Sequence, residues 1–422
     1  MSMLTDKASV YLSQNRLKEA EKTCLESLSK DPEDMQALLL LSSIYIKMEK
    51  PKKSIEAAKQ AVTLDPEFAA AHWTLGRAYL VDNDIKNSKA ALDESMRLDP
   101  EDPDNYLLTG AIEMDDGNNK KALSLFEKGL TFDPEKISLM NMKGNCLQKM
   151  GKTKEAEAVY REVLRLDPEN GDAIAGMGHA GLRKGNEKES LEYFKNALQM
   201  NPGNPEYKAG LIMALKSKFP VYGMLLRFTL WLMSFDQKTR LYIIFGGMIA
   251  FRALKNIARQ NPDTAVFIYP LLIAYGAFIL FSWIADPLLN SFLMINPYGR
   301  YALSENDRKG VYLFLSSTAL LTASILAGYF LKIGEFYMLS AVLGGFVILS
   351  GNIYGMEKSK RKTLVMSLIA GFVATGLLAV SILMIFDPKN GTLLNQTAII
   401  GFVASMLLFI ATTWVAGLAG EK

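Results

Sequence analysis

One short motif recurs through the first half of this chain at a constant spacing. Each copy places a proline after an aspartate or asparagine, as in "TLDPEF" at 63–68 and "RLDPED" at 97–102. The prolines are Pro32, Pro66, Pro100, Pro134, Pro168 and Pro202, so every interval is 34 residues. A constant period in this range indicates a stacked array, in which each repeat packs only against its neighbours. We therefore divide residues 1–204 into six repeats, which begin at residues 1, 35, 69, 103, 137 and 171.

Two columns of small residues predict how each repeat is built. Position 8 holds Ala, Ser or Gly and position 20 holds Ala or Ser in all six repeats, whereas position 28 is always apolar. Small side chains let two helices approach closely, and larger neighbours then fill the space around the contact. The proline at position 32 ends the second helix, because it lacks a backbone N–H and restricts the residue before it. Each repeat should therefore be a pair of packed helices.

These columns resemble the tetratricopeptide repeat, a helix–turn–helix unit of 34 residues. The stretch "AHWTLGRAYL" at 71–80 matches it well, whereas Glu113 and Gly181 replace an aromatic residue of the pattern. The resemblance implies an all-α fold, in which residues 1–204 wind into a right-handed superhelical solenoid. An open solenoid exposes the apolar face of its last repeat, so we expect the amphipathic stretch 205–219 to be a capping helix.

The second half of the chain differs in charge and composition. Residues 1–204 contain 28 Lys and Arg against 34 Asp and Glu, a net charge of −6, while residues 205–422 contain 19 against 10, a net of +9. The second half also holds five uncharged runs of roughly 20 residues, the length that crosses a hydrocarbon core of ~30 Å. These runs are 264–285, 311–331, 337–355, 363–386 and 397–418. They predict a multi-pass membrane protein with a four-helix transmembrane bundle in residues 311–422.

The stretch 220–310 joins the repeats to this bundle. Residues 221–235 combine apolar residues with one Arg and one Trp, which favours a helix lying in the membrane interface. Residues 241–258 could form a further span if Arg252 snorkels to the surface, and with the next run they form a two-helix membrane hairpin. A monotopic hairpin over 241–285 remains the alternative. Residues 286–310 are too polar to cross and should end in a cytoplasmic loop.

Basic residues predict the orientation of the spans. The segment 356–362 holds four of them between two spans, and such segments usually face the cytoplasm. With six spans and cytoplasmic repeats, the inner segments hold ten Lys and Arg and the outer segments five, so we place the repeats and the C-terminus in the cytoplasm. The first residues lack a basic start followed by an apolar core, so we expect no signal peptide.

Few residues indicate chemistry. The acidic repeats argue against nucleic-acid binding, and no motif predicts a cofactor or metal site. Cys24 and Cys146 lie in different repeats, with no disulfide or metal spacing. Cys146 and His179 could form a nucleophilic pair, but packing explains both better. The spans after residue 310 lack ionisable residues, which argues against transport. We therefore predict no enzyme activity.

The resemblance places the functional surface on the inner face of the solenoid, at positions 2, 5, 6, 9, 12 and 13 of the first helices. These positions include Trp73, Thr74, Arg77, Leu107, Leu108, Met114, Asn141, Met142, Asn145, His179 and Arg183. Such a groove suits a segment of a partner protein or peptide, although each residue could also be ordinary surface or packing. We predict a membrane-held scaffold that contacts lipid, that can assemble with other membrane proteins and that can form homo-oligomers. A transporter or membrane enzyme regulated by its repeats is the alternative.

Overall fold

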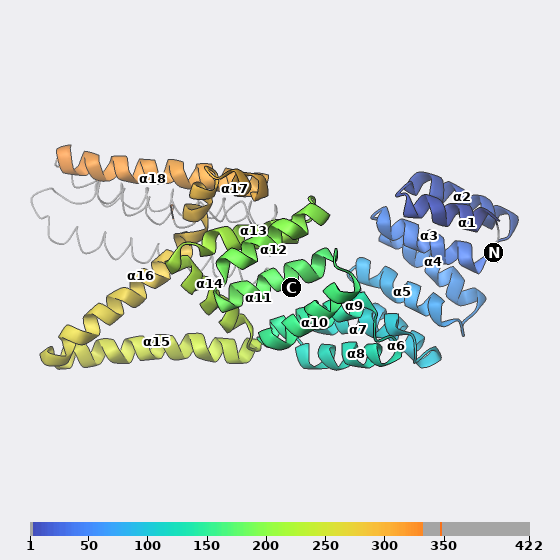
Figure 1. The fold of residues 1–422 in the computed structure, drawn as a ribbon, viewed down its shortest axis with the longest axis horizontal. Helices are drawn as coiled ribbons and strands as arrows, with labels where there is room; N and C mark the ends of the chain where they lie inside the picture. Colours follow the sequence, from blue (N-terminus) through green and yellow to red (C-terminus); the bar gives the residue numbers. More distant parts are fainter. Residues whose placement is uncertain (1–2, 332–346, 348–422) are drawn as a thin grey trace, which may run out of the picture. The chain divides into compact units, whose positions relative to one another are not determined.

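The computed structural model describes residues 3–331 and residue 347, and within this part all regular structure is α-helical (Figure 1). The predicted spans 363–386 and 397–418, and all of 337–355 except Val347, lie outside the described residues. The chain divides into two compact units. Of the described residues, the first unit contains 3–210 and 226–243, and the second contains 211–225, 244–331 and 347.

The first compact unit begins with helix pairs that follow the 34-residue period. The first helices are α1 (Met3–Ser13), α3 (Met35–Lys47), α5 (Ala69–Val81), α7 (Pro103–Asp115), α9 (Ile137–Lys149) and α11 (Gly171–Lys184). The second helices are α2 (Leu17–Lys30), α4 (Pro51–Leu64), α6 (Ile85–Leu98), α8 (Asn119–Phe132), α10 (Thr153–Leu166) and α12 (Glu187–Met200). Helix α13 (Pro205–Ser217) follows, over most of the segment predicted as a capping helix. The prediction of an all-helical solenoid is confirmed for the repeats.

Close packing inside each repeat explains the column of small residues at position 8. A Cβ atom added to Gly144 would lie 2.5 Å from the ring of Tyr160, and one added to Gly178 would lie 2.9 Å from the ring of Phe194. Both rings occupy position 24 of their repeats and are fully buried. Repeat 1 has the smaller Cys24 at this position, and there position 8 is an alanine. Glycine at position 8 therefore accompanies the larger side chains at position 24.

A residue with left-handed backbone conformation follows the end of every first helix, at the same position of each repeat. Position 15 has a positive φ in all six repeats, and it is Asn15, Glu49, Asn83, Gly117, Gly151 and Gly185. The following N–H bonds back five residues, as Lys152 does to the carbonyl of Leu147 at 2.9 Å. This is the left-handed C-cap in which glycine is favoured and asparagine is tolerated.

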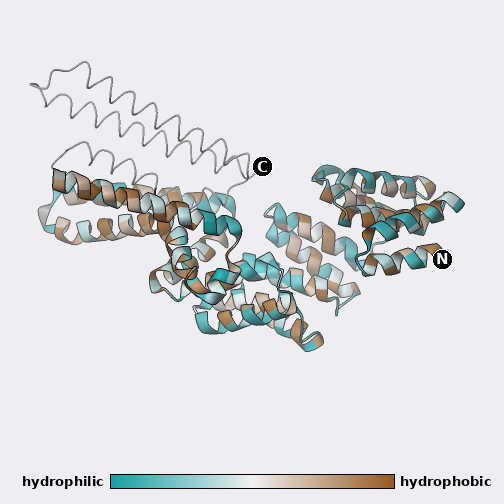
Figure 2. Cartoon of the chain, turned by 90° about the horizontal axis from the view of Figure 1, so that it is seen from above, coloured by the Kyte–Doolittle hydropathy of each residue, from teal (hydrophilic) through white to brown (hydrophobic). Residues whose placement is uncertain are grey.

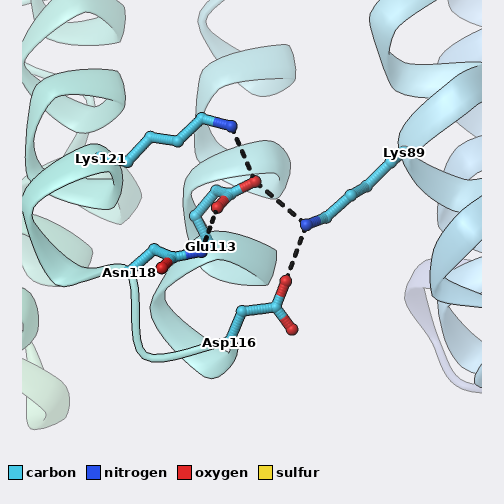
Figure 3. Close-up of polar contacts among 5 residues, drawn as sticks. All are labelled: Lys89, Glu113, Asp116, Asn118 and Lys121. Atoms are coloured by element: carbon cyan, nitrogen blue, oxygen red, sulfur yellow. Dashed lines mark hydrogen bonds and ion pairs between the residues drawn. The ribbon is translucent and has the colours of Figure 1, made fainter. Parts of the chain in front are cut away.

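One junction in the array is packed differently from the others. Helices α6 and α7 contact each other less extensively than the corresponding helices at the other junctions between the six repeats, and α5 and α7 barely touch. Instead, Nζ of Lys89 on α6 lies 3.1 Å from Glu113 and 2.7 Å from Asp116 of repeat 4 (Figure 3). Lys89 therefore forms an ionic bridge across the junction at which the helices pack least extensively.

Glu113 is the centre of this ionic network. Its side chain is 3% exposed and accepts from Lys121 at 3.0 Å and Asn118 at 2.9 Å (Figure 3). Burial alone would raise the pKa of this carboxyl, but hydrogen bonds from Asn118, Lys121 and Lys89 outweigh burial and lower the pKa to about 2. The departure from the aromatic pattern at position 11 thus marks a buried carboxylate that is fully partnered.

The chain beyond α13 contains long apolar helices. They are α14 (Pro220–Met233), α15 (Gln237–Gln260), α16 (Pro262–Leu293), the short α17 (Pro297–Ala302) and α18 (Glu305–Leu331). Helices α15, α16 and α18 are long and apolar enough to cross a membrane. Hydrophilic and hydrophobic residues alternate along the repeat helices, whereas hydrophobic residues dominate α18 (Figure 2). Membrane association is thus indicated by the length and composition of three helices.

Helix α16 continues beyond the predicted end of its span at residue 285. It passes through Pro287 and ends at Leu293, and the hydroxyl of Ser291 donates to the carbonyl of Pro287 at 2.8 Å. A proline inside a helix removes one backbone hydrogen bond and bends the helix without necessarily ending it. Asn296 then caps α17, accepting from two backbone N–H groups. The segment after residue 285, which we expected to be too polar to cross, is therefore helical for two further turns.

A buried lysine pairs with an aspartate of this extended part of α16. Nζ of Lys216 lies 2.6 Å from Oδ1 of Asp286, and the lysine is 4% exposed. Tyr222 packs beside them, with Nζ of Lys216 5.7 Å from its ring centre. Burial, followed by the charge of Asp286, raises the pKa of Tyr222. All three residues belong to the second compact unit, so the pair fixes α13 to α16 within it.

Candidate partner-binding surface

The first helices of the repeats form a continuous inner layer at most junctions. Helix α1 contacts α3, α3 contacts α5, α7 contacts α9, and α9 contacts α11, whereas successive second helices make no comparable contacts. Elements that lie closer together in a curved stack lie on its inner side. The predicted groove residues all belong to these first helices.

Trp73 and Arg77 form the most distinctive pair on this layer. They lie one turn apart on α5, and the guanidinium is 5.6 Å from the centre of the indole ring. The indole Nε1 is buried and has no hydrogen-bond partner among the described residues. Burial also lowers the pKa of Arg77, and no described carboxylate compensates for it. Arg77 therefore offers guanidinium donors that no described residue accepts from, beside the aromatic ring of Trp73.

The neighbouring residues of repeats 3 and 4 are apolar or buried. Leu107 and Leu108 on α7 are partly exposed, so both can contribute apolar contact area. Thr74 is 5% exposed and donates to the carbonyl of Ala70 at 2.8 Å, and Met114 is 8% exposed within an apolar cluster. Thr74 and Met114 are therefore buried packing residues and not exposed parts of the surface.

Repeat 5 supplies two asparagines with different roles. Asn141 is 7% exposed and donates to Oδ1 of Asn170 at 3.0 Å, while its own Oδ1 has no partner among the described residues. Asn145 is exposed and accepts from the hydroxyl of Tyr160 at 2.7 Å. Only Asn145 therefore presents its amide to solvent.

The residues of repeat 6 are engaged within the chain. His179 packs edge-on against Phe194, with ring centres 4.8 Å apart. Burial first, and then the charge of Arg183, lower the pKa of His179 to about 4, so the imidazole is neutral at pH 7. Arg183 donates to the backbone carbonyl of Leu230 at 3.0 Å. The sequence could not show that a residue 47 positions later supplies this acceptor.

The cysteines show no sign of reactivity. Burial raises the pKa of Cys146 to about 11, and its thiol donates to the carbonyl of Asn119 at 3.2 Å. Burial likewise raises the pKa of Cys24 to about 12. A nucleophile needs a thiolate, which these surroundings disfavour. No cluster of three possible metal ligands occurs among the described residues.

Comparison with known families covers two parts of the array. The family described as "Tetratricopeptide repeat" matches residues 36–68, and the one described as "Psidin, N-terminal TPR repeats region" matches residues 112–220. The first half of the chain is built of tetratricopeptide repeats. No curated protein matches the chain.

Several solved structures resemble this half of the chain at low identity. They include the APC/C hetero-tetramer Cut9–Hcn1, with 17% identity and a TM-score of 0.46 over 50% of this chain and 42% of the other. Pseudomonas aeruginosa pilF has 18% identity and a TM-score of 0.42, over 49% of this chain and 94% of its own. YrrB, "a TPR protein with an unusual peptide-binding site", has 20% identity and a TM-score of 0.34, over 44% and 95%. This chain thus spans less than half of the first of these proteins.

Proposed function

We propose that this protein is a membrane-anchored tetratricopeptide scaffold that binds a protein or peptide through the inner layer of its repeats. Tetratricopeptide repeats typically mediate protein–protein interactions. The three long apolar helices supply the anchor. The repeats and the C-terminus face the cytoplasm in this proposal, because basic residues concentrate in the segments assigned to that side.

The pair of Trp73 and Arg77 is the observation that carries the proposal. A partly buried guanidinium without an acceptor is costly in the free protein, and a carbonyl or carboxylate oxygen of a partner would satisfy it. Trp73 offers apolar area, and the partly exposed Leu107 and Leu108 offer more on the next first helix. Tryptophan and arginine are also the residues that most often dominate binding energy at interfaces. Asn145 and His179 are the adjoining part of the same predicted groove.

Site-specific photo-crosslinking in cells tests the proposal. The full chain carries a photoreactive amino acid at Leu108, or at Met200 on a second helix as a control. We expect a discrete crosslinked partner from position 108 and none from position 200. The double variant Trp73→Ala with Arg77→Ala should remove this adduct.

A matched variant separates binding from folding. Met200→Ala with Arg165→Ala truncates one large apolar side chain and one arginine on the second helices, where both side chains are exposed. The adduct at position 108 should persist in this control. An adduct that persists equally in the folded Trp73 and Arg77 variant would remove the pair from the binding site.

The transporter or enzyme alternative predicts a different result. Purified full-length protein in vesicles would move a solute or turn over a substrate, while position 108 captures no partner. That pair of results would replace the scaffold by the alternative.

A further inference from the structure

Helix α14 docks on repeats 5 and 6 through one row of residues. This docking row consists of Arg227 and Leu230, which lie three residues apart on one side of α14, and of Ser234, which directly follows the last residue of the helix. Nη1 of Arg227 lies 3.3 Å from Oε1 of Glu187 at the start of α12. The carbonyl of Leu230 accepts from Arg183 at the end of α11.

Arg183 acts as a cap for the end of α14. The N–H of Ser234 bonds to the carbonyl of Trp231 at 3.1 Å, which leaves the Leu230 carbonyl for another donor. The last carbonyls of a helix lack intrahelical partners and carry the negative end of its dipole, so a guanidinium is a favourable ligand there. The contact therefore stabilises α14 in its docked position.

Two glycines of the repeats allow the docking row to approach closely. A Cβ on Gly151 would lie 3.1 Å from Cβ of Ser234, and one on Gly185 would lie 3.1 Å from Nη1 of Arg227. Gly117 occupies the same position of repeat 4, and a Cβ there would meet nothing within 4 Å. Repeats 5 and 6 thus have contacts at position 15 that repeat 4 lacks.

A second row of aromatic residues follows the docking row one residue later. This aromatic row consists of Phe228, Trp231 and Phe235, with ring centres 5.8 Å and 4.9 Å apart. Phe228 and Trp231 are 44% and 48% exposed. One residue corresponds to about 100° around a helix, so Phe228 and Trp231 point away from the repeats while Arg227 and Leu230 contact them.

We propose that α14 binds the surface of a lipid bilayer through the aromatic row, while repeats 5 and 6 hold it by the docking row. The inference rests on the membrane part of the proposed function. Helix α15 begins four residues after α14 and is apolar and long enough to cross a membrane, so α14 lies next to a candidate membrane entry in the chain. Tryptophan and other aromatic residues favour the headgroup region, and amphipathic helices lie in that plane. The docking row is thus the link between the array and the lipid surface.

Quenching by brominated lipid tests the lipid side of the proposal. Full-length protein is reconstituted into phosphatidylcholine nanodiscs with or without bromine near the headgroup end of the acyl chains. The difference between wild type and Trp231→Phe isolates the emission of Trp231. We expect this share to lose intensity in the brominated discs. An unquenched Trp231 in protein that is embedded in the disc overturns the lipid contact, whereas protein that fails to embed overturns the proposed anchoring itself.

Hydrogen exchange tests the repeat side on the same samples. The variant Gly151→Asn with Gly185→Asn keeps a left-handed position that Asn15 and Asn83 adopt elsewhere, but its side chains collide with the docking row. We expect residues 227–236 to exchange about tenfold faster in this variant and in Arg183→Gln, because a hydrogen bond from a charged donor is lost. Gly117→Asn should leave that exchange unchanged. Unchanged exchange in the first two variants, or equal acceleration in the Gly117 control, overturns the docking.

Discussion

The substitution Glu113→Gln isolates the charge at the centre of the junction between repeats 3 and 4. Glutamine keeps the size of the side chain but cannot form ion pairs with Lys89 and Lys121. The carboxyl pKa falls from 4.5 in the unfolded chain to about 2 in the folded protein. Each pKa unit corresponds to about 1.4 kcal/mol, so the ionised side chain contributes up to about 3 kcal/mol. Glu113 is buried, but its partner Lys121 is 64% exposed, and solvent weakens the attraction of an exposed charge. We therefore expect Glu113→Gln to lower the free energy of unfolding by about 2 kcal/mol.

The sign of the pH dependence follows from the lowered pKa. The contribution is complete above pH 4.5, the unfolded value, and it is lost as the pH falls towards 2. At about pH 3 less than half of it should remain, because the unfolded carboxyl is then protonated while most of the folded carboxyl is still ionised. The difference in the free energy of unfolding between wild type and Glu113→Gln should therefore become smaller in acid.

Hydrogen exchange of the full-length protein measures this contribution locally. At pH 7 the amides of α7 and α8 should exchange roughly 30-fold faster in Glu113→Gln, since about 2 kcal/mol corresponds to that factor. Helix α6 should lose protection as well, because Lys89 bridges the weakly packed junction. Asp115→Asn is the control, since Asp115 is 82% exposed and its partner Lys149 is 3.9 Å away. Equal protection in wild type and Glu113→Gln, or equal loss in the control, would refute the reasoning.

Three further outcomes are expected from single substitutions. Asp286→Asn should lower the melting temperature of the detergent-solubilised protein more than Lys216→Met does. The first substitution leaves a buried ammonium group unpaired, whereas the second leaves an aspartate that is 60% exposed, so the reverse order would contradict the pairing of the two residues. Gly144→Ala should destabilise the array by about 1–3 kcal/mol in thermal unfolding, because its Cβ would lie 2.5 Å from a buried ring, and a neutral effect would show that the helix pair can widen. His179→Leu should reduce the loss of stability between pH 6.5 and 4, because burial lowers the imidazole pKa and protonation then favours the unfolded state. If chemical denaturation gives the same pH dependence of stability for wild type and variant, His179 does not have this role.

Local, repeated features of this protein could be predicted from the sequence. The proline period sets the end of every second helix, and the small residues at position 8 set the close approach that Gly144 and Gly178 make to their ring partners. These features depend on contacts within one repeat, so their spacing along the chain is enough to reveal them. Trp73 and Arg77 could be singled out for the same reason, since one helical turn separates them.

Contacts between distant segments were decided only by the tertiary structure. Glu113 was visible as a departure from the repeat pattern, but its partner Lys89 belongs to the preceding repeat, and its lowered pKa depends on the hydrogen bonds that the folded chain brings to it. Arg183 was assigned to the groove by its position, yet its acceptor is a backbone carbonyl of α14. A periodic sequence specifies which side of a helix is apolar, because that depends on near neighbours. It does not specify which polar group lies opposite a given charge, because that depends on how segments far apart in the chain meet.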